Sequence, residues 1–109
     1  MRLTFNESKL SYKYQVFDLK HPIKDAIQYG DFAIVIFDFN YYFKTNNKSN
    51  CQAFDLSKDA ERIWIAKLPI IENDSYVSFF KNKTLWSWSC YRVQIDFKTG
   101  EIVNKAFGK

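Results

Sequence analysis

The sequence predicts a mainly β protein whose short strands follow one another in an antiparallel meander, as one curved sheet or as two packed sheets. Apolar and polar residues alternate with a period of two in several short segments, as in strands with one buried face. Tight polar turns separate these segments. Aromatic residues make up 19% of the chain and favour packed strand faces. The length of 109 residues fits one domain, residues 1–109.

The expected strands are short and lie close together along the chain. In residues 10–19 the alternation puts Tyr12, Tyr14 and Val16 on one face of a single half-buried strand. Residues 31–39 are apolar on both faces, which predicts a central strand covered on both sides. The remaining expected strands are residues 51–56, 62–68, 76–80, 85–89, 91–97 and 102–107.

One short helix is expected at about residues 22–29, packed on a sheet. Pro22 suits the first position of a helix, and Gly30 suits the residue after its end. Ile23, Ala26 and Ile27 have the i, i+3, i+4 spacing of a helix with one apolar face.

A hairpin turn is expected at Ser89–Cys90. Trp86 and Trp88 share their alternation parity with Arg92, and not with the apolar residues that follow Arg92. The inward face must therefore change between residues 88 and 91, because a slip of one residue moves every side chain to the other face. A turn would make residues 85–89 and 91–97 antiparallel neighbours.

An aspartate between two apolar residues recurs along the chain. It stands at Asp18, Asp38, Asp55 and Asp96, and three of these four are about 40 residues apart, a period typical of propeller blades. An aspartate at the end of a strand can accept a hydrogen bond from the backbone amide two residues on. We therefore expect these residues to start turns.

LWSWSCYRVQIDFKTGEIV, residues 85–103, resembles a quinoprotein-type propeller blade in its order of strand, turn, strand, Asp and Thr-Gly turn. NCQAFDLSKDAERIWIAKL, residues 50–68, resembles the last two strands of a preceding blade, with Trp64 at the blade's tryptophan position. The resemblance covers residues 50–107 and implies local structure, without quinone chemistry. Two blades cannot close a ring, since propellers use about 4–8 blades. Where that pattern commonly has Gly, this chain has Cys90, which reaches positive φ less easily.

Small proteins of this two-blade kind resemble immunity proteins from bacterial toxin loci. The segments AFDL with RIWIA, SYVSFF and WSWSCYRVQIDFKTG carry this likeness. It implies a non-catalytic binding protein that neutralises a cognate bacterial protein toxin, with a nuclease as one candidate, by covering its active site.

The residues do not predict a reaction. His21 is the single histidine, and no metal-ligand spacing or known catalytic motif occurs. Cys51 and Cys90 are expected to be reduced, small, buried hydrophobes. We therefore expect no enzyme activity, no cofactor and no metal.

The net charge of +4 and the pI near 9.0 suit an acidic partner or nucleic acid, although the basic residues are scattered. Binding of single-stranded nucleic acid is the alternative function, since aromatic side chains beside Lys81 and Lys83 suit base stacking. No apolar run is long enough to span a membrane, and no secretion signal is visible, so a cytoplasmic protein without membrane contact is expected.

The candidate partner-binding residues are aromatic or arginine anchors and loop carboxylates, because Trp, Tyr and Arg dominate binding energy at interfaces. The carboxylates would form a local acidic cluster that suits the basic site of a nuclease. The candidates are Tyr41, Tyr42, Asp59, Glu61, Glu72, Asp74, Trp86, Trp88 and Arg92.

Overall fold

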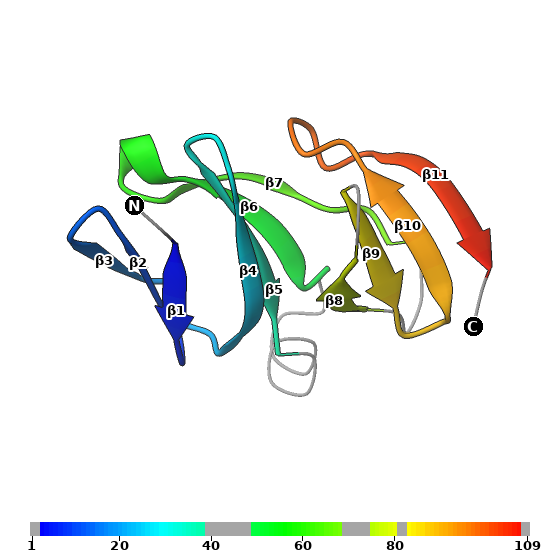
Figure 1. Ribbon diagram of the computed structural model, residues 1–109, viewed down its shortest axis with the longest axis horizontal. Helices are drawn as coiled ribbons and strands as arrows, with labels where there is room; N and C mark the ends of the chain where they lie inside the picture. Colours follow the sequence, from blue (N-terminus) through cyan, green and yellow to red (C-terminus); the bar gives the residue numbers. More distant parts are fainter. Residues whose placement is uncertain (1–2, 39–48, 69–74, 81–82, 108–109) are drawn as a thin grey trace.

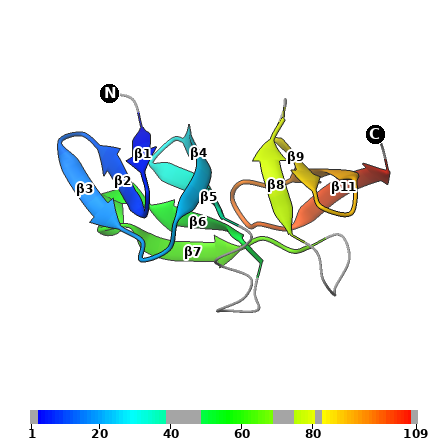
Figure 2. The ribbon, with the colours of Figure 1, turned by 90° about the horizontal axis from the view of Figure 1, so that it is seen from below.

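Three antiparallel sheets lie in a row in the computed structural model (Figures 1 and 2). The structure describes residues 3–38, 49–68, 75–80 and 83–107. Neighbouring strands in every sheet are consecutive in sequence, so each sheet is a meander. The mainly β, antiparallel prediction is confirmed, with three sheets in place of the one or two that were expected. The radius of gyration of 13.1 Å is the value that a compact domain of this length should have.

The N-terminal sheet contains β1 (Thr4–Asn6), β2 (Lys9–Tyr12) and β3 (Gln15–Asp18). The central sheet contains β4 (Ile23–Tyr29), β5 (Phe32–Phe37), β6 (Cys51–Asp55) and β7 (Glu61–Ile65), with the short 3-10 helix η1 (Leu56–Lys58) between β6 and β7. The C-terminal sheet contains β8 (Tyr76–Phe79), β9 (Thr84–Ser87), β10 (Tyr91–Ile95) and β11 (Ile102–Phe107).

The central sheet is covered on both faces. Ile34 and Ile36 of β5 point into a core shared with the C-terminal sheet. Ala33, Val35 and Phe37 point the other way, into a second core shared with the N-terminal sheet. The prediction of a central strand with two covered faces is therefore confirmed, and the cover on each side is a sheet.

The expected helix at residues 22–29 is wrong, because this segment is strand β4. It pairs with β5 and turns back through Gly30, whose φ of +60° suits the first position of a two-residue hairpin loop. The register shifts between Ile23 and Asp25, which marks a β-bulge. The extra residue lets Ile23 and Ala26 reach the same core although they are three residues apart. The bulge therefore imitates the i, i+3 spacing of a helix.

Residues 10–19 form a hairpin instead of the single strand that we predicted. Lys13 and Tyr14 both have positive φ, at 48° and 67°, and they form the two-residue turn between β2 and β3. Tyr14 is 95% exposed at this tip. Such turns usually contain Asn-Gly, and Lys13-Tyr14 does not resemble that turn signal.

Three of the four recurring aspartates, Asp18, Asp55 and Asp96, start turns as predicted, each at the end of the third strand of its sheet; the residues that follow Asp38 lie outside the described part of the chain. The Oδ1 atom of Asp18 accepts a hydrogen bond from the amide of Lys20 at 2.9 Å. Asp55 accepts one from the amide two residues on at 3.0 Å, and Asp96 does so at 2.8 Å. The sequence repeat is thus a repeat of local structure.

The turn after Asp96 joins the C-terminal sheet to the central sheet. The indole Nε1 of Trp64, on β7, donates to the carbonyl of Phe97 at 2.9 Å. Gly100 packs on the same indole so closely that an added Cβ would lie 2.6 Å from Cε3 of Trp64. This contact fixes the position of the Phe97–Gly100 segment.

Candidate binding site

An aromatic and arginine cluster lies on the outer face of the C-terminal sheet. Trp86 of β9 and Arg92 of β10 are direct cross-strand partners. The Arg92 Cζ atom lies 5.7 Å from the centre of the Trp86 ring, which is a cation–π contact. The ring of Phe80, which is 48% exposed, meets Trp86 edge-on with 5.9 Å between the ring centres. We call these three residues the Phe80–Trp86–Arg92 cluster.

The β9–β10 turn puts the cluster on the outer face. The predicted turn at Ser89–Cys90 is confirmed, because β9 ends at residue 87 and β10 begins at residue 91. Cys90 has a φ of 71°, the left-handed conformation that a glycine would take easily. Trp88 is 65% exposed in this turn and lies beyond the end of β9. It is therefore not at a strand position beside Trp86.

The outer face at the other end of the molecule has a different character. One cross-strand row of the N-terminal sheet contains Thr4, Ser11 and Val16. The next row is entirely polar and contains Asn6, Lys9 and Asp18. These two rows are polar apart from Val16, which is 63% exposed, and neither contains an arginine or an aromatic residue.

Asp59 and Glu61, the two described members of the predicted acidic cluster, do not lie beside the Phe80–Trp86–Arg92 cluster. Asp59 and Glu61 are both exposed at the β6–β7 connection. This connection lies toward the N-terminal sheet, away from β9 and β10 (Figures 1 and 2). The other predicted residues, Tyr41, Tyr42, Glu72 and Asp74, lie outside the described residues.

The two cysteines have different environments. Cys51 is buried in the core between the central and C-terminal sheets, and burial raises the pKa of its thiol. Cys90 is exposed, so the expectation that it is buried is wrong. Both are free thiols. The turn position explains the exposure, because the side chain of Cys90 belongs to neither strand of the hairpin.

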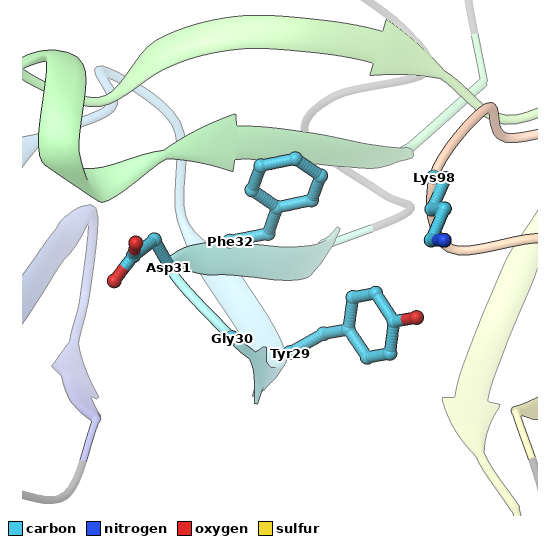
Figure 3. Close-up of a pocket in the computed structure, with 5 residues that line it drawn as sticks. All are labelled: Tyr29, Gly30, Asp31, Phe32 and Lys98. Carbon is cyan, nitrogen blue, oxygen red and sulfur yellow. The ribbon is translucent and has the colours of Figure 1, made fainter.

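A pocket that the sequence did not reveal opens at the tip of the β4–β5 hairpin (Figure 3). Its volume is about 410 Å³, and its lining residues are Tyr29, Gly30, Asp31, Phe32 and Lys98. The rings of Tyr29 and Phe32 extend toward the turn that carries Lys98, and the Asp31 carboxylate points to the opposite side (Figure 3). Sequence reasoning missed this site because it treated the hairpin as a helix; the Gly30-Asp31 pair was the available signal.

A second lysine lies beside the pocket. The Lys83 Nζ atom is 4.7 Å from the ring centre of Tyr29 and 6.0 Å from that of Phe97. Tyr29 also meets Phe97 edge-on at 5.4 Å between ring centres. These contacts fix the Tyr29 ring and add positive charge near it.

Among the described residues, no three histidine, cysteine or acidic side chains are grouped as a metal site would need. In the same part of the chain, no helix has the length and hydrophobicity needed to cross a membrane. Neither the comparison with curated proteins nor that with solved structures gave a match. The model of a family described as a domain of unknown function, DUF7957, matches residues 1–107, so the chain belongs to that family.

Proposed function

We propose that this chain is a non-catalytic immunity-type protein that neutralises a cognate bacterial toxin in the cytoplasm by covering its active site. The observation that carries the proposal is the Phe80–Trp86–Arg92 cluster on an outer sheet face. Trp and Arg are the residues most enriched among the anchors of protein interfaces. Trp86 and Arg92 both lie on strands, and side chains held on a strand lose less entropy on binding than side chains of a mobile loop.

The chemistry of the cluster indicates the kind of surface that it would meet. The guanidinium of Arg92 rests against the Trp86 ring, so its flexibility is already reduced before binding. A carboxylate on the toxin could then form a bidentate pair with Arg92, while the two rings of the cluster bury apolar surface. The net charge of +4 favours the same acidic partner surface.

The experiment starts from the gene immediately upstream of the gene for this chain. Its product is expressed in cells with and without this protein, and the affinity of the two purified proteins is measured by calorimetry. We expect a toxic product that this protein silences through a tight complex. A harmless product, or a toxic one that this protein neither binds nor silences, would refute the immunity proposal.

Variants then test whether the outer face of the C-terminal sheet is the binding interface. Trp86→Ala and Arg92→Glu should each weaken the complex by at least about 30-fold, the loss expected at an interface hot spot. Trp88→Ala removes the same side chain from the adjacent turn, and Lys24→Glu makes the same charge change on an exposed residue of β4; both should bind nearly as wild type. Equal losses in the cluster variants and in their controls would show that the outer face is not the interface.

A further inference from the structure

We propose that the pocket at the β4–β5 hairpin binds a planar aromatic anion, with the base and phosphate of a nucleotide as the ligand class. The pocket and the Phe80–Trp86–Arg92 cluster share no residue, so this proposal does not depend on the proposed toxin inhibition. Its volume of about 410 Å³ lies within the range of small-molecule sites, about 300–1,000 Å³.

Two aromatic rings supply the surface for the planar part of the ligand. The ring centres of Tyr29 and Phe32 are 6.5 Å apart, with 55° between the ring planes. Both side chains are partly buried against the core between the central and C-terminal sheets, so their positions are set before a ligand arrives. Aromatic side chains held in this way are what nucleobases stack on, without regard to sequence.

Two lysines supply the charge. Lys98 is exposed and lines the pocket across from the two rings (Figure 3). Lys83 lies over the Tyr29 ring and raises the positive potential near it. The Asp31 carboxylate also lines the pocket but points away from the gap between the rings and Lys98, so the gap itself faces the lysine and not the carboxylate (Figure 3). A ligand that is aromatic and negatively charged uses both features of the site.

The backbone that carries Lys98 is held firmly. The Lys98 amide donates to Asp96 Oδ1 at 2.8 Å, and the Gly100 amide donates to the Asp96 carbonyl at 2.7 Å. Gly100 packs on the indole of Trp64 in the central sheet. The lysine and the two rings therefore belong to elements that contact each other, and the gap between them has a defined width.

The test is an NMR titration of the full chain with adenosine monophosphate, cytidine monophosphate, inorganic phosphate and adenosine. The chain has three glycines, so the Gly30 amide is easily assigned and reports on the pocket directly. We expect a nucleotide to shift the Gly30 and Asp31 amides, with much smaller shifts for inorganic phosphate or adenosine alone. Failure of both nucleotides to shift these amides would overturn the proposal.

Lys98→Glu should weaken nucleotide binding at least about tenfold, because it replaces an attraction by a repulsion. Lys24→Glu makes the same charge change on an exposed residue of β4 outside the pocket and should bind as wild type. Tyr29→Leu keeps apolar volume but removes the stacking face, and should weaken binding by about tenfold. Equal binding by the two lysine variants would overturn the proposal.

A last measurement distinguishes a free nucleotide from a nucleotide within a single strand as the ligand. If a single-stranded oligonucleotide of roughly ten residues binds more tightly than the mononucleotide, and loses affinity steeply with salt, the ligand is a nucleotide within a strand. If the oligonucleotide binds no more tightly, the ligand is a free nucleotide. Either result supports the site, and binding of the strand without a shift at Gly30 would overturn it.

Discussion

Replacing Asn50 by alanine should strongly destabilise the fold, because this side chain ties the central sheet to the C-terminal sheet. Asn50 is 1% exposed, just before β6. Its Nδ2 group donates to the carbonyl of Phe37 at 2.9 Å and to that of Tyr76 at 2.8 Å. Its Oδ1 atom accepts from the amide of Tyr76 at 2.8 Å. One amide side chain thus bonds both backbone groups of the first residue of β8.

The expected loss follows from these three hydrogen bonds. The alanine variant leaves the buried amide of Tyr76 without its acceptor, which costs about 1–3 kcal/mol. The two carbonyls lose a donor each, at about 1 kcal/mol per bond. The free energy of unfolding should therefore fall by about 3–5 kcal/mol, a large part of the roughly 5–15 kcal/mol that a domain has.

Urea unfolding followed by tryptophan fluorescence measures this loss. The midpoint should fall while the slope of the free energy with urea stays the same, because the surface exposed on unfolding does not change. Asn104→Ala, at an exposed position of β11, is the matched control and should change the stability by no more than about 0.5 kcal/mol. A loss below about 1 kcal/mol for Asn50→Ala would mean that water replaces the lost bonds and that the reasoning is wrong.

Two further predictions concern turns. Gly100→Ala should lower the free energy of unfolding in urea by at least about 3 kcal/mol, because it combines a φ of +79° with a clash between the new Cβ and a buried indole. Gly30→Ala, with a φ of +60° and open space around the Cβ, should lower it by only about 1–2 kcal/mol. Similar costs for the two variants would contradict the clash. The Asp18 pKa should lie below its ordinary value, because the carboxylate accepts hydrogen bonds from the Lys20 amide, which has the larger effect, and from the Ser8 hydroxyl. Its stabilisation is therefore present above the ordinary aspartate pKa and is lost as pH falls through the lowered pKa. In an NMR titration Ser8→Ala should raise the Asp18 pKa; an unchanged pKa would show that the hydroxyl has no effect.

The alternation of apolar and polar residues, which can be read over a few residues, predicted most of the strands. The alternation in residues 91–97 placed Arg92 and Gln94 outward, and both are exposed in β10. The prediction failed where one residue changed the period. The bulge in β4 gave Ile23 and Ala26 a helical spacing, and a bulge cannot be distinguished from a helical turn without knowledge of the partner strand.

The pocket could not have been predicted from the same local rules. It combines the β4–β5 hairpin with a turn that follows almost 70 residues later, and only the packing of two sheets brings them together. The cluster on β9 and β10 was more accessible to prediction. Trp86 and Arg92 are close in sequence, and a single turn sets which face they share. A site within one hairpin can be predicted from the alternation of side chains along its two strands, whereas a site between two sheets can be predicted only from the tertiary fold.

The contrast between the two ends of the row of sheets explains why a binding face should be sought at the C-terminal end. In this row the central sheet has both faces covered, whereas, within the described residues, the N-terminal and C-terminal sheets each have one face that no other sheet covers (Figure 1). Terminal units of stacked repeats normally have a polar outer face, because an apolar one would favour association. The N-terminal sheet follows this rule, with Val16 as the one apolar residue in its two cross-strand rows. The C-terminal sheet departs from this rule at Trp86, against which the ring of Phe80 packs from just beyond β8. A polar residue at either position would suit a solvated face. Solvation alone gives no reason for that departure, whereas the proposed partner protein, by covering the face, would.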